Sequence, residues 1–399
     1  MKIRVDKART YAMLDRLLFI QKVRLYPFNR TDAVVPQTLI PDWLRADKRR
    51  LANFYFFACI YMRGGITSST AFKLLLEILL ETPWMFEPRE VVEHSQEEVT
   101  EILKKKIGWD SKNAGQFWHK NAQLLVDNWG GEHLNVVNAT KSYDDAQRLY
   151  VNKNKKGKPF KGTDPREQGF WGHQHKMASM QVYFADWEEL YPVRFIYPGP
   201  VDFHNYRFFI SNGSVILLTN TESVSFGEQY SKPIREVLME YIISRKVDPL
   251  EIADAIWLYS LLMCGESPYT VTKEMVYDHK TEKTDVKRRN APLFTHSGVE
   301  DEKWDLMKWA SRKRRGLDRS CHVCAFNDEC QFAIPAGPYY GKKEDVNERG
   351  GKIILRKRPA LEFYLKPKDA HKALASEPLE GDAKIYNAFP EKLKVALTA

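Results

Sequence analysis

Two stretches between residues 169 and 207 carry a lysine and an aspartate, each at the start of an expected element. In the first, Gly172 lies in a turn that opens a helix, and Lys176 follows within its first turn. The backbone N–H groups at a helix N-terminus, together with a nearby cation, suit a phosphate. In the second stretch, prolines end the preceding segment and Asp202 begins a new element. Lys176 and Asp202 are therefore candidate catalytic residues that could converge on a cleft.

Each of these two residues also has an ordinary interpretation. Asp202 could simply cap the helix that follows it. Lys176 could contact a phosphate or face solvent without taking part in chemistry. The residue types alone leave these alternatives open.

The cysteines form the second strong pattern. Cys321, Cys324 and Cys330 follow C-x2-C-x5-C, which packs three thiolates into one tight turn. Cys264 follows an apolar helix and can supply a fourth ligand. Four thiolates hold either a [4Fe–4S] cluster or a zinc ion, and the spacing leaves both open. Cys59 lies in an apolar helical run and is expected to be a core residue.

The overall composition favours a polyanionic partner and a soluble, cytoplasmic protein. The chain has 61 Lys+Arg against 52 Asp+Glu, a net charge of +9. Its aromatic side chains could stack on bases or simply fill a core. A basic run at 153–158, which includes Lys155 and Lys156, is either a solvated loop or a contact to a DNA backbone. We find no signal peptide and no apolar stretch long enough to span a membrane.

Short helices with few strands predict an all-α bundle. The Gly130-Gly131 pair should end one helix, and Asp110 or Ser111 should cap its start. The run 208–219 alternates like a strand. The expected helices cover Ala8–Lys22, two runs within Leu51–Leu80, Glu97–Ile107, a helix ending at Trp129, Ile234–Arg245 and Glu251–Met263.

Three segments resemble the helix-hairpin-helix DNA glycosylases, the endonuclease III superfamily. Phe170–Ala178 is similar to the family's Leu-Pro-Gly-x-Gly-x-Lys-x-Ala hairpin, although Gln174 replaces the second glycine. Val201–His204 resembles the Val-Asp-x-His that carries the catalytic aspartate, and Ile107–Ala114 resembles an Ile-Gly segment that precedes the hairpin. Iron–sulfur members end in C-x6-C-x2-C-x5-C, and the last two intervals match here, with 265–320 as an insertion. Cas4-type nucleases share the terminal trio of cysteines, but we find no carboxylate–lysine core of their kind.

The resemblance covers about Leu51 to Phe332 and implies a mainly α, two-lobed fold with a cysteine-ligated cluster lobe. It implies an N-terminal extension (1–50), a DNA-binding lobe (51–190), a lobe with the aspartate and the iron–sulfur cluster (191–335) and a C-terminal extension (336–399). It also implies a monomer that extrudes and excises a modified base from double-stranded DNA. The implied roles are catalytic for Asp202 and Lys176 (the latter in AP-lyase activity), DNA-binding for Trp171, Gly172, His173, His175, Lys155 and Lys156, and [4Fe–4S] ligation for Cys264, Cys321, Cys324 and Cys330.

The resemblance also leaves other functions open. A divergent branch of the family acts on hypermodified pyrimidines of phage DNA, and includes alpha-glutamyl/putrescinyl thymine pyrophosphorylase-like enzymes and anti-phage glycosylases. A side-chain transferase on hydroxymethylated pyrimidines would keep the glycosidic bond intact. A non-catalytic DNA-binding protein stapled by its cluster would use Asp202 and Lys176 only as surface residues.

Overall fold

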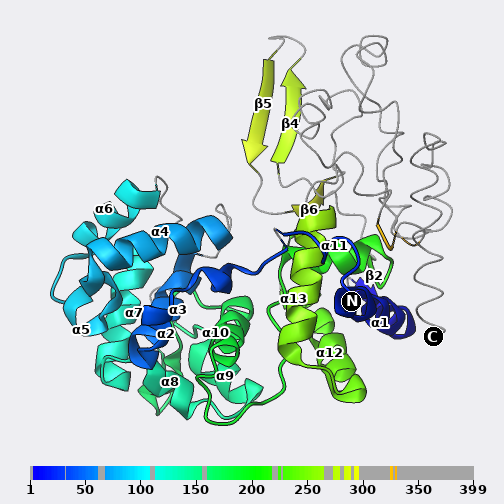
Figure 1. The fold of residues 1–399 in the computed structure, drawn as a ribbon. Helices are drawn as coiled ribbons and strands as arrows, with labels where there is room; N and C mark the ends of the chain where they lie inside the picture. The colour runs from blue at the N-terminus through cyan, green and yellow to red at the C-terminus, as the bar shows by residue number, and fades with distance from the viewer. Residues whose placement is uncertain are drawn as a thin grey trace. The chain divides into compact units, whose positions relative to one another are not determined.

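A computed structural model of the chain is mainly helical (Figure 1), which confirms the predicted fold class at this level. It divides into two compact units, each described here by itself. Unit 1 comprises residues 1–33, 201–237 and 254–399, and unit 2 comprises 34–200 and 238–253. The residues described are 3–31, 33–61, 68–107, 113–154, 160–217, 223–225, 228–264, 273–278, 283–288, 292–295, 324–326 and 329.

Unit 2 is built almost wholly from helices and short helical turns. In chain order it contains η1 (Pro36–Leu39), α2 (Asp42–Arg45), α3 (Lys48–Tyr61), α4 (Ser68–Glu81), η2 (Pro83–Phe86), α5 (Pro88–Val91), α6 (Gln96–Ile107), α7 (Ala114–Trp129), α8 (His133–Ala139), α9 (Tyr143–Tyr150), η3 (Pro165–Gln168) and α10 (His175–Trp187).

Unit 1 combines helices with short antiparallel strand pairs. Within the residues described, β1 pairs with β2, β3 with β6 and β4 with β5. The helices α12 (Glu228–Arg245) and α13 (Pro249–Tyr259) cross the unit boundary at 237/238 and 253/254. The other elements are β1 (Ile3–Val5), α1 (Lys7–Lys22), α11 (Phe203–Ser211), β2 (Val215–Leu217), β3 (Ser223–Ser225), the π-helical turn η4 (Ser260–Cys264), β4 (Lys273–Asp278), β5 (Lys283–Arg288) and β6 (Pro292–Thr295).

Helix α3 is the centre of unit 2. Every residue from Leu51 to Tyr61 is buried, as expected for a helix surrounded by others. Phe57 stacks on Trp118 of α7 with ring centroids 4.5 Å apart. Burial on all sides explains why this stretch of sequence is apolar without a polar face.

Several helix ends agree with the sequence. Helix α7 ends at Gly130, whose φ of +64° is left-handed, so the predicted glycine stop is confirmed. At its start the N-cap is Asn113, whereas Asp110 and Ser111 lie outside the described residues. No helix among the described residues is long and apolar enough to cross a membrane.

The strand expected over 208–219 is largely wrong. Helix α11 continues to Ser211, and among the described residues of this stretch the strand is confined to Val215–Leu217. The helix is nucleated at its N-terminus, where the side chain of Asp202 accepts a hydrogen bond from the backbone of His204. A local cap therefore outweighs the β-branched and aromatic residues downstream.

The units also differ from the ranges implied by the resemblance. Residues up to Ala33 belong to unit 1, where Arg4 of β1 pairs with Ile216 of β2, and are not a separate extension. The boundary expected at residue 190 falls between Pro200 and Val201. Strand pairing across so long a sequence separation leaves no local signal in the sequence.

Candidate functional site

Asp202 lies at the N-terminus of α11 and caps it. Its Oδ1 accepts a hydrogen bond of 2.8 Å from the backbone N–H of His204. In return the side chain of Asn205 accepts the N–H of Asp202 at 2.9 Å. This reciprocal pair has the form of a capping box and fixes the carboxylate at the helix start. Asp202 is half-buried.

His204 is a packing residue beside that cap. Its ring is 5% exposed and lies against Trp257 of α13, with centroids 5.7 Å apart. Its Nδ1 lies 3.2 Å from the hydroxyl of Ser260, the first residue of η4. Within unit 1, His204 thus joins the helix that carries Asp202 to the turn that ends at Cys264.

The turn before α10 is held by backbone pairing and by one asparagine. Gly172 has a φ of +79°, in keeping with its predicted place in a tight turn. The side chain of Asn121 on α7 accepts the N–H of Trp171 at 2.7 Å and donates to its carbonyl at 2.9 Å. Asn121 is fully buried, so this contact anchors the turn to α7.

His173 does not fit the DNA-binding role implied by the resemblance, because its side chain is only 1% exposed. The amide nitrogen of Gln181 donates to Phe56 O at 3.2 Å and to His173 Nε2 at 3.0 Å. A carbonyl can only accept, so this amide orientation is fixed and Nε2 must be unprotonated. His173 is therefore a neutral core residue, which the turn buries against α3 and α10.

A second buried histidine lies nearby, and the rings of both histidines contact that of Phe56. His133 of α8 donates from Nδ1 to Ala52 O at 2.8 Å, and its Nε2 accepts from the hydroxyl of Tyr150 at 2.8 Å. Burial is the main cause that lowers the pKa of His133 to about 3, and proximity to His173 lowers it further. Both histidines are thus held neutral in the centre of unit 2.

This burial makes the stability of unit 2 pH-dependent. Unfolded His133 gains a proton near its ordinary pKa of 6.5, whereas the folded state resists protonation until about pH 3. The free energy of unfolding should therefore be fully present above pH 6.5 and fall toward pH 3 by up to about 1.4 kcal/mol per pH unit. Urea unfolding should show a loss of about 2 kcal/mol between about pH 7 and about pH 5 that is missing in His133→Gln. Equal pH slopes in both proteins would contradict this prediction.

Lys176 lies in the first turn of α10 and is half-buried. The N-cap residue Gln174 makes no side-chain hydrogen bond to the helix. The positive charge of Lys176 lies close enough to Cys59 to lower the pKa of that thiol in part, although burial raises it more strongly. Cys59 is fully buried, as expected for a core residue. His175 is half-buried, and its Nδ1 lies 2.7 Å from Gln147 Oε1.

Lys120 is a cation beside the turn that the sequence did not single out. Its ammonium lies 4.6 Å from the centroid of the Trp171 ring. The ring of Trp171 also lies nearly parallel to that of Phe117, with centroids 6.5 Å apart. Lys120 lies one helical turn after Phe117 on α7, so the two side chains share a face of the helix. This spacing is the signal in the sequence that could have indicated Lys120.

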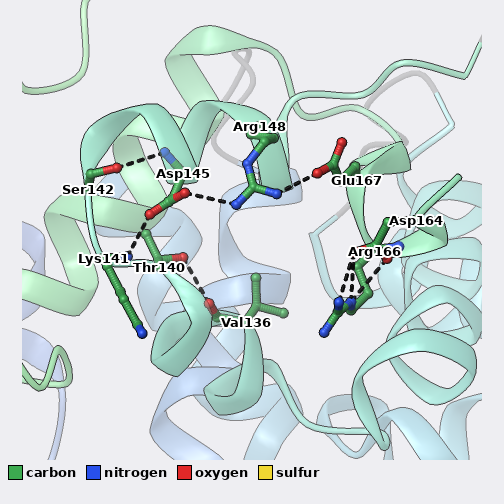
Figure 2. Close-up of polar contacts among 9 residues, drawn as sticks. All are labelled: Val136, Thr140, Lys141, Ser142, Asp145, Arg148, Asp164, Arg166 and Glu167. Carbon is green, nitrogen blue, oxygen red and sulfur yellow. Dashed lines mark hydrogen bonds and ion pairs between the residues drawn. The ribbon is translucent and has the colours of Figure 1, made fainter. Parts of the chain in front are cut away.

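The segment before the turn is held by ion pairs (Figure 2). Arg148 bonds to Asp145 at 2.8 Å on α9 and also to Glu167 of η3. Asp164 and Arg166 form a second, exposed pair, with Arg166 Nη2 2.8 Å from Asp164 Oδ2. The predicted DNA contacts Lys155 and Lys156 lie outside the described residues.

One cysteine of the terminal trio is described. Cys324 is half-exposed, and its Sγ lies 3.0 Å from the hydroxyl of Tyr259. That hydroxyl accepts the backbone N–H of Ala325 at 3.1 Å, so its own proton is available to the sulfur. Tyr259 directly precedes η4, which ends at Cys264. The chain therefore brings Cys324 next to the helix that leads to Cys264.

The Tyr259 hydroxyl beside Cys324 fits a thiolate that binds a metal group, since ligand sulfurs are commonly supported by hydrogen bonds from neighbours. Cys321, Cys330 and the side chain of Cys264 lie outside what the structure describes. Among the described residues, no group of three or more His, Cys, Asp or Glu side chains could hold a metal ion.

The implied site residues are thus divided between the two units. Lys176, Trp171, Gly172, His173 and His175 belong to unit 2. Asp202, Cys264 and Cys324 belong to unit 1.

No family model matches this chain, and no curated protein matches it either. The chain is a mainly helical protein of two compact units.

Proposed function

We propose that this protein is a DNA N-glycosylase of the helix-hairpin-helix type that excises a modified base and leaves an abasic site. The observation that carries the proposal is the cap at α11, where Asp202 is fixed at a helix start within Val201–His204. The similarity of this motif and of the turn before α10 to the family's motifs supports it.

The turn before α10 is the proposed contact to the DNA backbone. The uncapped first turn of α10 offers N–H groups and the partial positive charge of a helix N-terminus. Lys176 in the first turn of α10 and Lys120, whose ammonium lies over the Trp171 ring, add two cations. Together these groups suit a phosphate of the duplex.

Asp202 would act on the sugar of an extruded nucleotide. As the glycosidic bond breaks, its electron pair leaves with the base nitrogen and the sugar gains positive charge. A carboxylate beside the sugar stabilises that charge, and it can accept the proton of the water whose oxygen bonds to C1′. In a bifunctional enzyme, the amine of Lys176 would attack C1′ in place of water and form a Schiff base.

Cys264, Cys321, Cys324 and Cys330 are the proposed ligands of a [4Fe–4S] cluster, with zinc as the alternative occupant. When bound, such a group would cross-link the end of η4 to the distant cysteine segment. The contact between Cys324 and Tyr259 supports this placement.

The deciding experiment is a product analysis by mass spectrometry. The anaerobically purified protein would be incubated with ordinary DNA, damaged DNA and phage-type DNA with hydroxymethylated or glycosylated pyrimidines. A released base with a matching abasic site is the expected result. An altered nucleoside without free base would instead identify a side-chain transferase and contradict the proposal.

A second candidate function is DNA binding without catalysis. It is favoured by one observation, that the Asp202 carboxylate already accepts a backbone N–H as an ordinary cap does. In that case Asp202 and Lys176 variants would change DNA affinity, and no DNA substrate would give a product.

A further inference from the structure

We infer that helix α1 is a clamp that holds the cysteine segment, defined here as residues 324–326 and 329, with Arg16 as its main positioning residue. The sequence resemblance begins only at Leu51, so it gave α1 no role. The inference deepens the proposed function. Its second part, that the clamp protects a bound metal group, rests on the proposal that these cysteines hold one.

Arg16 makes three contacts to the segment from one side chain. Its Nη1 donates to the carbonyl of Ala325 at 3.2 Å and to Glu329 Oε1 at 2.8 Å. Its guanidinium lies 5.6 Å from the centroid of the Phe326 ring. A planar, permanently charged group can satisfy all three partners at once, which an ammonium does less well.

Burial strengthens these contacts. The side chains of Arg16 and Glu329 are only 28% and 23% exposed, so solvent screens their ion pair less than a surface pair. The second oxygen of Glu329 is buried and has no hydrogen-bond partner among the described residues. Loss of Arg16 would therefore leave a half-buried carboxylate without compensation, and the segment would tend to move toward water.

Arg9, two helical turns before Arg16 on α1, adds a second point of contact. It donates to the carbonyl of Asn212, in the turn before β2, and lies 3.5 Å from the carbonyl of Glu329. Helix α1 thereby reaches both the α11–β2 turn and the cysteine segment.

The segment packs against α11 and α13 as well. The Phe326 ring makes edge contacts to Tyr259 and Phe208, with centroids 5.1 and 5.3 Å apart. Because Cys324 bonds to the hydroxyl of the same Tyr259, movement of Phe326 would also free the Cys324 thiol. The clamp therefore controls how exposed Cys324 is to reagents and how firmly it can hold a metal.

The test measures alkylation of Cys324 by iodoacetamide in the full-length native protein, followed by peptide mass spectrometry. Arg16→Gln should speed the modification of Cys324 by roughly tenfold, as expected from loss of a charge-assisted hydrogen bond. Arg16→Lys should restore part of the protection. Lys22→Gln is the matched control, since Lys22 ends the same helix, is exposed and carries the same charge.

Two internal checks make the result decisive. Cys59, fully buried in unit 2, should react at its wild-type rate in every variant. Glu329→Gln removes the same ion pair without changing α1, and it should also speed Cys324 modification. It serves as the test if Arg16→Gln does not fold. Rates for Arg16→Gln and Glu329→Gln equal to that of Lys22→Gln, or equal acceleration at Cys59, would overturn the clamp.

Metal content of the same samples separates the clamp from the proposed function. Iron or zinc in the wild type should be lost to a chelator faster from Arg16→Gln than from Lys22→Gln. A wild-type protein with neither metal would overturn the proposed cluster, yet the Cys324 rates would still decide whether α1 holds the segment.

Discussion

Asp202→Asn is expected to lower the rate of base release by roughly 10²- to 10³-fold while leaving the fold as stable as the wild type. Asparagine removes the negative charge that would stabilise the sugar cation and accept a proton from water. It keeps an oxygen that can accept the N–H of His204, and asparagine is as good an N-cap as aspartate. The variant therefore separates the chemistry of Asp202 from its part in starting α11.

Asp202→Ala is the matched control. It should lose base release to the same degree, and it should also lower the free energy of unfolding by about 1 kcal/mol, because the cap is gone. Single-turnover base release measures the first effect, and urea unfolding followed by circular dichroism measures the second. Full activity of Asp202→Asn would show that Asp202 is only a cap.

Much of the helical framework could be predicted because its signals are local. Helix α7 ends where a glycine can adopt a left-handed conformation, and α1 begins after a capping aspartate, Asp6. A continuous apolar run located α3, and the alternation of apolar and charged residues located α6, in the same way. Each of these features depends on residues within one or two turns of each other.

The candidate site could be predicted only in part, because burial depends on the rest of the fold. In the sequence, His173 lies in a turn among aromatic and basic residues. Its burial and its contact with Gln181 on α10, which the sequence does not show, place it in the core. Lys120 is a candidate site residue because it contacts Trp171, which is far away in the sequence but packed against α7. Likewise, no local pattern showed that Arg16 contacts the segment that carries Cys324.

Gly169→Ala is expected to lower the free energy of unfolding by about 3 kcal/mol. Gly169 has a φ of +72° and a ψ of −169°, a region open almost only to glycine. A Cβ there would lie 2.1 Å from the carbonyl oxygen of Val151 and 2.4 Å from its carbon. Both are backbone atoms, which cannot turn away as a flexible side chain can.

The Gly169 backbone lies where two segments pair on the way to the turn before α10. Phe170 donates to Tyr150 O at 3.1 Å, and Lys153 donates to Gln168 O at 2.9 Å. To admit a methyl group these segments must separate and lose such hydrogen bonds. The same displacement would move Trp171 away from Asn121, so the proposed contact of this turn with DNA should weaken together with stability.

Gly130→Ala is the matched control for backbone conformation alone. Gly130 also has a left-handed φ of +64°, but the nearest atom to its added Cβ is a side-chain nitrogen of Asn135 at 3.6 Å, an ordinary contact. It should therefore cost only about 1 to 2 kcal/mol, the penalty of a non-glycine residue in this conformation. Urea unfolding of the two variants side by side tests the argument. Equal losses would mean that the Val151 backbone yields easily, and that close pairing of these segments does not hold the turn in position.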